Sequence, residues 1–162
     1  MTKLLHTLVA AIAVFLLSIP LARAADFSKD ELSGIRSLFD AYGKAYAAKD
    51  YERLRQFVHL PFVNFRNEFA VFDSMEAVIA RWKAAREPLD LRGYKSSRYV
   101  ETRVTPLAAD RALVSAKYQR YKEDGSLLQE LATVYIVVKR DGAWKIAGSM
   151  FQEQEYFGMI VQ

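Results

Sequence analysis

Hydrophobic residues recur at helical spacing in the first half of this chain and at alternate positions in the second half. Between residues 28 and 48 they form one stripe, made of Leu32, Ile35, Leu38, Phe39, Tyr42, Ala45 and Tyr46. This period predicts an amphipathic helix that faces a core. Shorter stripes predict a second helix over about 51–58 and a third over about 75–87, before a proline. Capping boxes at Ser28–Glu31 and Asp73–Glu76 mark the starts of the first and third helices.

The hydrophobic period shortens to two from Tyr94 onward, which is typical of β-strands. This pattern predicts strands over 94–105, 111–122, 128–140 and 143–152, after an extended segment at 58–65 and a short return strand at 69–72. Asp124-Gly125 and Asp141-Gly142 are hairpin signals because glycine tolerates positive φ. Since long strands twist and coil, we predict an α+β fold: a cone-shaped, strongly curved, mostly antiparallel sheet wrapped around three N-terminal helices.

Residues 1–24 have the organisation of a secretory signal peptide. Lys3 supplies a positive charge, an almost wholly apolar run follows, and Ala22-Arg23-Ala24 is an A-x-A cleavage pattern. The apolar run is short for a membrane-spanning helix, so an uncleaved anchor is the weaker alternative. We predict cleavage after Ala24, a periplasmic or secreted location without stable membrane insertion, and a single domain over 25–162.

Composition narrows the chemistry of the predicted domain. The leader holds two of the 23 Lys and Arg residues and none of the 19 acids, so the remaining chain has a net charge of +2. No cationic cluster interleaves with aromatic residues, and nucleic acid is therefore not an expected partner. The chain has no cysteine, and His59 is the only histidine after the leader. These counts exclude thiol chemistry and argue against a metal site, and we expect no cofactor.

Alternation along the strands predicts which side chains face the concave side of the sheet. The inward sets are Ala112, Val114, Ala116, Tyr118 and Arg120 on one strand, and Trp144, Ile146, Gly148, Met150 and Gln152 on the last. His59, Asn64, Arg66, Arg98 and Tyr42 are further polar candidates for the concavity. An apolar concavity with a few convergent polar groups is typical of a small-molecule site. Taken singly, each of these residues also fits an ordinary core or rim position.

The acidic residues fall mostly in caps, turns and helix surfaces. Alternation places Glu101 with Tyr99 and Arg103 on the outward side of its strand. The sequence contains no paired carboxylates placed for hydrolysis, no glycine-rich phosphate loop and no G-x-S-x-G motif.

The strand over 128–140 is apolar on both faces, which predicts that something covers its outer face. A second subunit packed against Leu131, Tyr135 and Val137 would provide that cover, so we expect a homodimer through the outer sheet face. The apolar tail over 156–161 is expected to pack over a pocket mouth or across the dimer.

The order of these elements resembles the nuclear-transport-factor-2-like superfamily. Lys49-Asp50 between the first two helices and Asp141-Gly142-Ala143-Trp144-Lys145-Ile146 in the last hairpin carry the resemblance, which covers about 28–152. The superfamily includes the SnoaL-like cyclases and the ketosteroid isomerases, and the resemblance implies their cone-shaped fold. Because it also contains dehydratases, epoxide hydrolases and non-catalytic binding modules, the resemblance does not choose a function.

Steroid-isomerase chemistry can be checked against this resemblance one residue at a time. Tyr42 and Asp50 match the oxyanion tyrosine and the turn aspartate of that pattern. Arg66 stands at the position of the general base, with Asn64 beside it, and the stretch 132–137 has no acid to serve as the second oxyanion donor. A guanidinium does not release its proton at neutral pH, so we exclude isomerase chemistry of this type.

A secreted binding module is the first function that the sequence favours. Arg66, Arg98 or Arg120 would meet the carboxylate or enolate of a small apolar or weakly anionic molecule, since the arginine fork pairs with carboxylate in two places. Tyr42, Asn64, Trp144 and Met150 would supply further ligand contacts.

Two other functions stay open. One is a metal-free isomerase, cyclase or dehydratase that acts on an enolisable carbonyl compound, with His59 as general acid or base and with Tyr118 and Arg120 stabilising negative charge. The other is a non-catalytic dimerisation module. The sequence does not settle whether the protein is an enzyme.

Overall fold

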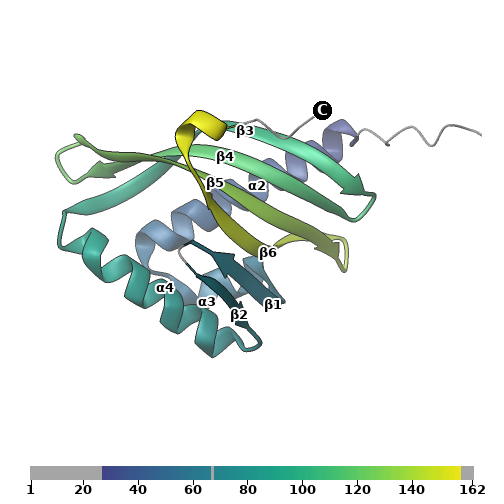
Figure 1. Ribbon diagram of the computed structural model, residues 1–162, viewed down its shortest axis with the longest axis horizontal. Coiled ribbons are helices and arrows are strands. Elements are labelled where there is room, and N and C mark those ends of the chain that lie inside the picture. Colours follow the sequence, from purple (N-terminus) through teal and green to yellow (C-terminus); the bar gives the residue numbers. More distant parts are fainter. Residues whose placement is uncertain (1–26, 67, 158–162) are drawn as a thin grey trace, which may run out of the picture.

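The computed structural model describes residues 27–66 and 68–157. Its helices are α2 (Lys29–Ala48), α3 (Tyr51–Leu54) and α4 (Met75–Asp90), with short 3₁₀ helices η1 (Arg55–Phe57) and η2 (Gln154–Tyr156). Its strands are β1 (Val58–Phe65), β2 (Phe69–Phe72), β3 (Tyr94–Ala108), β4 (Arg111–Lys122), β5 (Leu127–Arg140) and β6 (Ala143–Gln152). The predicted α+β fold with a strongly curved sheet is confirmed (Figure 1). The predicted leader lies outside the described residues, as does the end of the apolar tail.

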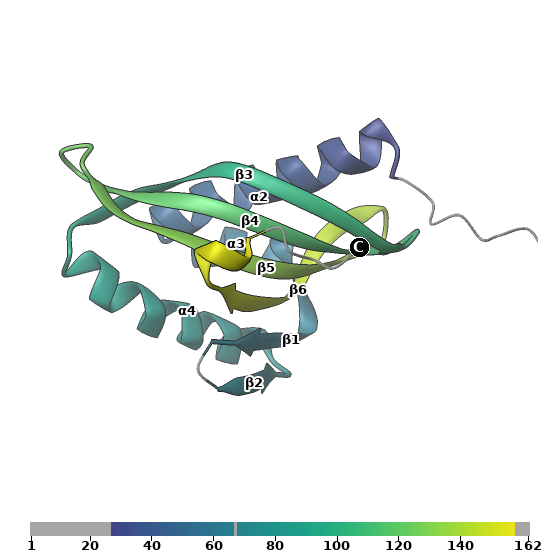
Figure 2. The ribbon, with the colours of Figure 1, turned by 45° about the horizontal axis from the view of Figure 1, so that its top comes forward.

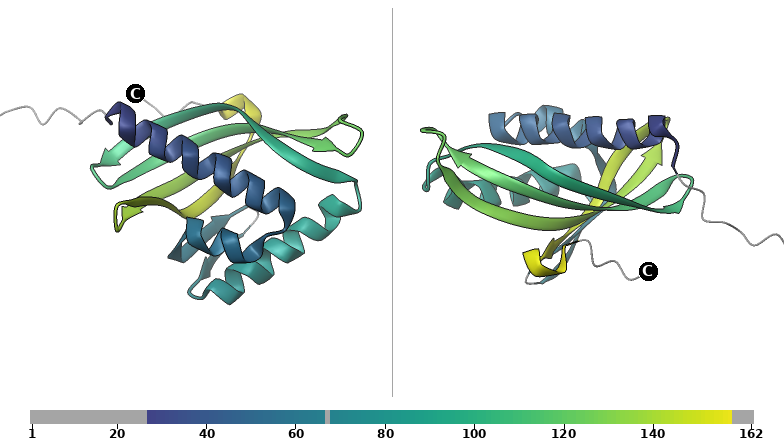
Figure 3. Two further views of the ribbon diagram at one scale, coloured as in Figure 1. Left: turned by 180° about the vertical axis from the view of Figure 1, so that it is seen from behind. Right: turned by 90° about the horizontal axis from the view of Figure 1, so that it is seen from above.

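The six strands form one sheet in the order β2-β1-β6-β5-β4-β3. The expected run of consecutive antiparallel strands is confirmed from β3 to β6. A pairing that the sequence did not indicate joins β1 to β6 in parallel, with Asn64 opposite Ser149. Helix α2 crosses one face of the sheet and η2 lies against the other (Figure 3). Helix α4 lies beside the β1–β2 hairpin (Figure 2).

The first turn of α2 is hydrogen-bonded to strands β5 and β6 of the sheet. The Ser28 hydroxyl accepts the N–H of Glu31 at 3.2 Å, as a capping residue does. The Glu31 carboxylate does not reach back to complete the predicted capping box. It accepts hydrogen bonds from Lys139 Nζ at 2.7 Å and from Trp144 Nε1 at 2.8 Å. These contacts fix the first turn of α2 to the β5–β6 hairpin.

Helix α4 also differs from its predicted form at both ends. Ser74 caps it alone, by accepting the N–H of Ala77 at 3.3 Å, while Glu76 pairs with Arg55 at 2.9 Å. The helix does not end before Pro88 but continues to Asp90. A proline in the last turn removes only one hydrogen bond, and the following residues are held by other contacts because Leu89 is buried.

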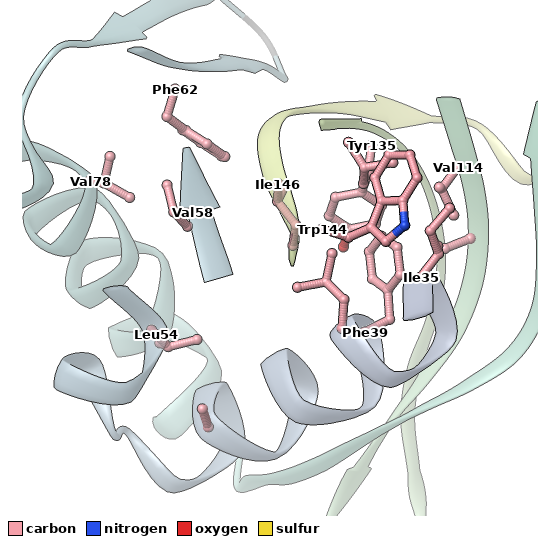
Figure 4. Close-up of a cluster of buried hydrophobic side chains, with 14 of the residues drawn as sticks. Ile35, Phe39, Leu54, Val58, Phe62, Val78, Val114, Tyr135, Trp144 and Ile146 are labelled. Carbon is pink, nitrogen blue, oxygen red and sulfur yellow. The ribbon is translucent and has the colours of Figure 1, made fainter. Parts of the chain in front are cut away.

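The core lies between α2 and the inner face of the sheet. Ile35 and Phe39 of α2 face Val114, Tyr135 and Ile146 of the strands (Figure 4). The predicted inward set of β4 is confirmed by Ala112, Val114 and Ala116, which are fully buried. No helix of the described residues is long and apolar enough to cross a membrane.

The expectation for the outer face of β5 is wrong in its residues. Leu131, Tyr135 and Val137 pair with Tyr118, Val114 and Ala112 of β4 and share their inner face. The outer face carries Ala132, Val134 and Ile136 instead. The segment after β6 lies against this outer face: Gln154 donates to the carbonyl oxygen of Glu130 at 2.7 Å, and the Arg103 guanidinium lies 5.3 Å from the Phe157 ring centroid.

Candidate functional site: an aromatic pocket with arginines

A pocket of about 140 Å³ lies between α2, α4 and the inner face of the sheet. Aromatic residues are the largest group in its lining: Tyr42, Tyr46, Phe62, Trp82, Tyr99, Tyr118, Tyr135 and Phe151. Its cationic side chains are Arg66, Arg81 and Arg120, and its neutral polar ones are Asn64, Ser97, Thr133 and Ser149. Within the described part of the chain, neither a carboxylate nor a histidine lines this pocket.

Five of the residues proposed from the sequence meet at this pocket. Tyr42 comes from α2, Asn64 and Arg66 from the end of β1, and Tyr118 and Arg120 from the inner face of β4. They come together because the parallel pairing of β1 with β6 closes the sheet beside α4.

The other four proposed residues lie outside the pocket lining. His59 is half-buried on β1 and does not line the pocket. Arg98 is exposed and pairs with Gln119, on the opposite face from Tyr118. Trp144 faces inward as expected, but its ring packs against Phe27 with centroids 5.3 Å apart, at the other end of α2.

Met150 is misplaced by a β-bulge in β6. Val137 pairs with Ile146 and Ile136 with Gly148, so Ala147 is the extra residue. One inserted residue moves every following side chain to the other face. Ser149 and Phe151 therefore line the pocket, whereas Met150 does not.

A second bulge, at Val100, makes the inward-facing residues of β3 differ from those that simple alternation predicts. Tyr99 pairs with Tyr118, but Glu101 already pairs with Lys117. Tyr99 consequently lines the pocket, while Glu101 faces outward as predicted. Helix α4 contributes Arg81, Trp82 and Ala85 to the lining. The helical pattern over 75–87 predicted the helix but did not indicate these residues as part of a site.

The guanidinium of Arg120 lies between two phenol rings. Its carbon is 5.5 Å from the ring centroid of Tyr118 and 5.7 Å from that of Tyr94, distances at which a cation is attracted to the ring face. Its Nε atom is buried and has no hydrogen-bond partner. None of the salt bridges between described residues includes Arg120.

The other two arginines lie on the more open side of the pocket. Arg81 of α4 donates to Asn64 Oδ1 at 3.5 Å, and Asn64 in turn donates to Ser149 Oγ at 2.9 Å. Arg66 is exposed, and its guanidinium carbon lies 5.9 Å from the ring centroid of Phe151, which is 44% exposed. We call this side, where Arg66 and Phe151 meet solvent, the mouth of the pocket.

The phenols of the pocket are held in their protonated form. Burial raises the pKa of Tyr42, Tyr99 and Tyr135 well above the ordinary value for tyrosine. Burial also raises the pKa of Tyr46 to about 12, although the charge of Arg120 acts in the opposite direction. At neutral pH these side chains are therefore available as hydrogen-bond donors and not as bases.

An ion pair that includes one buried arginine links the helices around the pocket. Arg86 of α4 is 4% exposed; it pairs with Asp90 at 2.7 Å and donates to the carbonyl oxygens of Tyr46 and Ala47 at 2.6 and 3.2 Å. It therefore satisfies the carbonyls at the end of α2. Its guanidinium carbon also lies 4.4 Å from the ring centroid of Tyr94.

Among the described residues, no group of three or more acidic or histidine side chains is placed to hold a metal ion. The lining offers phenols, amides, hydroxyls and guanidinium groups. This set can bind an anion or a hydrogen-bond acceptor.

Comparison with protein families agrees with this architecture. The model of the family described as NTF2-like protein (DUF6841) matches residues 30–154, which is most of the chain. The chain belongs to this family. The resemblance inferred from the element order is therefore confirmed at the level of the superfamily and its fold. No curated protein matches this NTF2-like chain.

Solved structures show the same fold at low identity. A protein of unknown function with a cystatin-like fold from Nostoc punctiforme is 13% identical, with a TM-score of 0.67 over 78% of this chain and 93% of that one. An NTF-2-like protein of unknown function from Shewanella oneidensis is 14% identical, with a TM-score of 0.61 over 76% and 99%. A ketosteroid isomerase-like protein from Erwinia carotovora is 18% identical, with a TM-score of 0.56 over 76% and 95%.

Proposed function

We propose that this NTF2-like protein is a SnoaL-like binding module that holds one small, largely apolar or weakly anionic molecule in its pocket. The observation that supports this most is the composition of the lining: aromatic walls and three arginines, without an acid or an imidazole among the described residues. Apolar walls with a few placed polar groups are typical of sites that bind small molecules.

The alternative of an enzyme acting on an enolisable carbonyl compound has less support. It needs a group that takes a proton at neutral pH, within hydrogen-bond reach of the substrate. His59 lies outside the lining, Arg66 keeps its proton, and burial raises the pKa of the Tyr42 phenol. The similarity to a ketosteroid isomerase-like protein concerns the fold, so we do not transfer that activity.

Intrinsic fluorescence gives a direct test, because the chain has two tryptophans and only Trp82 lines the pocket. In a Trp144→Phe variant, the emission reports on Trp82 alone. We expect small aromatic and aliphatic compounds to change this emission in a saturable way. The matched Trp82→Phe variant, whose emission comes from Trp144, should show no change. Failure of every compound in a panel of neutral and anionic molecules to alter Trp82 emission or raise Tm would refute the proposal.

We also propose that the protein acts outside the cytoplasm. The proposal rests on residues 1–24, whose charged start, apolar run and A-x-A pattern are typical of a signal peptide. Expression of the full chain in a bacterium, followed by fractionation and intact-mass measurement, tests it. The expected product lies in the periplasm or medium and begins at Ala25. A cytoplasmic or membrane-bound product that still carries residues 1–24 would contradict it.

A further inference from the structure

We propose that the ligand of this pocket is a monocarboxylate whose apolar body is the size of a single ring, and that its carboxylate binds Arg120. This inference rests on the proposed function and names the chemical class and the orientation of the molecule that the pocket takes. It follows from a comparison of the arginines around the pocket, from the position of the mouth, and from the size of the cavity.

Arg86 is a buried arginine whose guanidinium has its hydrogen-bond partners within the chain. Arg86 has a carboxylate at 2.7 Å and two carbonyl oxygens in hydrogen-bond distance. Arg120 shares the Tyr94 ring with Arg86 and has a buried Nε with no partner. A buried polar group without a partner is costly, and the cost is larger for a charged group. The chain therefore supplies hydrogen-bond acceptors for Arg86. The neighbouring Arg120 lines the pocket, and its Nε has no acceptor among the described residues.

An anion from outside would supply what Arg120 lacks. A carboxylate accepts two parallel N–H bonds from a guanidinium, and such bonds are stronger than those between neutral groups. The lining around Arg120 adds donors and no competing acid, since Tyr46, Tyr118 and Ser97 are its lining neighbours on α2, β4 and β3. The interior of the pocket is thus better suited to a negative head group than to an amide or an alcohol.

The mouth arginines are less suited to hold that head group. Arg66 is exposed and stacks on Phe151, so water competes for it. Arg81 already donates to Asn64. A carboxylate at Arg120 would leave the apolar body for aromatic residues elsewhere in the lining, such as Tyr42, Phe62 and Trp82. Arg66 and Arg81 would then attract the anion toward the pocket without fixing its position.

The cavity limits the body of the ligand. Its volume is about 140 Å³, close to the ~150 Å³ of an apolar cavity that holds benzene. One ring or a short branched chain fills such a space. A fused or linked second ring would have to extend through the mouth.

Calorimetric titration with phenylacetate and its neutral isostere phenylacetamide tests the inference on the purified protein. We expect phenylacetate to bind at least tenfold more tightly than the amide at pH 7, with the difference shrinking as salt is added. In Arg120→Gln, the acid and the amide should bind alike. In the matched variant Arg98→Gln, which removes an exposed arginine on the outer face of β3, the preference for the acid should remain. Biphenylacetate should bind more weakly than phenylacetate.

Each contrary result identifies what has failed. Equal binding of acid and amide to the unmodified protein would overturn the inference and leave the apolar binding module standing. Loss of the acid preference in Arg98→Gln, or its retention in Arg120→Gln, would overturn the orientation, and tight binding of biphenylacetate would overturn the size limit. If no compound of any charge binds, the proposed function itself fails. Circular dichroism and Tm confirm that Arg120→Gln is folded.

Discussion

Arg86 and Arg120 lie on the same aromatic ring and have opposite surroundings. The guanidinium of Arg86 is 4.4 Å from the Tyr94 ring centroid and that of Arg120 is 5.7 Å from it. Asp90 neutralises the first, so the two like charges are tolerated side by side. Arg86 is thus a structural residue whose charge is balanced by Asp90, whereas Arg120 has no carboxylate partner among the described residues.

Replacement of Arg86 by methionine should lower the free energy of unfolding by about 1–3 kcal/mol, because it removes one of the two cations bonded to Asp90 and leaves the carbonyl oxygen of Ala47 without its side-chain donor. Urea unfolding at pH 7 measures the change. Arg98→Met is the matched control, since Arg98 is exposed on β3, and it should alter stability by less than about 0.5 kcal/mol. Equal stability of the two variants would mean that Arg86 contributes nothing specific.

The lowered pKa of Asp90 predicts how the stability of the protein changes at acid pH. Burial by itself would raise the pKa of Asp90, but hydrogen bonds from Lys49 and Arg86 lower it overall. A folded-state pKa below the unfolded value of about 3.9 means that this carboxylate stabilises the fold above that pH. The stabilisation is lost as the pH falls through the folded-state pKa.

We therefore expect Asp90→Asn to be less stable than the unmodified protein at pH 7 and to lose less stability between pH 5 and pH 3. Urea unfolding across this pH range makes the comparison. Asp40→Asn, which changes an exposed acid of α2, is the matched control. Parallel curves for Asp90→Asn and the unmodified protein would show that Asp90 has no lowered pKa.

The parallel pairing of β1 with β6 is the element on which the pocket depends. It places Asn64 beside Ser149 and brings the end of β1 to the mouth. Gly148 makes this close approach possible: a Cβ there would lie 2.4 Å from Val63 Cγ2 and 3.0 Å from the Val63 carbonyl oxygen. The backbones could not stay at their present separation with any larger residue.

Gly148→Ala should therefore destabilise the protein by about 1–3 kcal/mol, the usual cost of overpacking, and should weaken ligand binding because β1 must move. Gly43→Ala is a useful comparison. Gly43 lies inside α2, and its added Cβ would make an ordinary 3.4 Å contact with Tyr99. That variant should gain about 0.5–1 kcal/mol from helix propensity. Urea unfolding that finds Gly148→Ala as stable as Gly43→Ala would contradict this account of the β1–β6 contact.

The elements that local signals specify could be predicted, whereas their long-range pairing could not. The Asp141-Gly142 turn was predictable because both residues take positive φ there, 53° and 77°. The pairing of Asn64 with Ser149 joins residues 85 positions apart, and no local pattern encodes it. The bulges at Val100 and Ala147 interrupt alternating runs, and the extra residue in each is neither glycine nor proline. Simple alternation along β4 predicted correctly that Tyr118 and Arg120 face the pocket. The bulges in β3 and β6 reversed the faces predicted for Arg98 and Met150.

At the scale of the whole molecule, the pocket adjoins a cluster of buried and half-buried tyrosines. Burial raises the pKa of Tyr42, Tyr46, Tyr94, Tyr99 and Tyr135, and this group is more than half of the nine tyrosines in the chain. Because they belong to three different elements, α2, β3 and β5, their ionisation is tied to the packing of the entire fold and not to one local site.

This cluster predicts a steep loss of stability in alkali. An unfolded phenol ionises near pH 10, whereas the folded phenols stay protonated to higher pH. A folded-state pKa above the unfolded value stabilises the fold fully below about pH 10, and this stabilisation is lost as the pH rises toward the folded-state pKa. We expect urea-unfolding free energies to be level near pH 8–9 and to fall above pH 10, while ultraviolet absorbance shows part of the phenols ionising only as the protein unfolds.

Removal of one buried phenol should lower by one the number of phenols that ionise only when the protein unfolds. Tyr42→Phe should reduce the late phenolate absorbance and make the fall above pH 10 less steep, because one fewer phenol ionises on unfolding. Tyr156→Phe, which removes a tyrosine that is 54% exposed, is the matched control. If all nine phenols ionise together near pH 10 in the folded protein, the tyrosines are in contact with water, and the pocket is not the enclosed aromatic site that ligand binding requires.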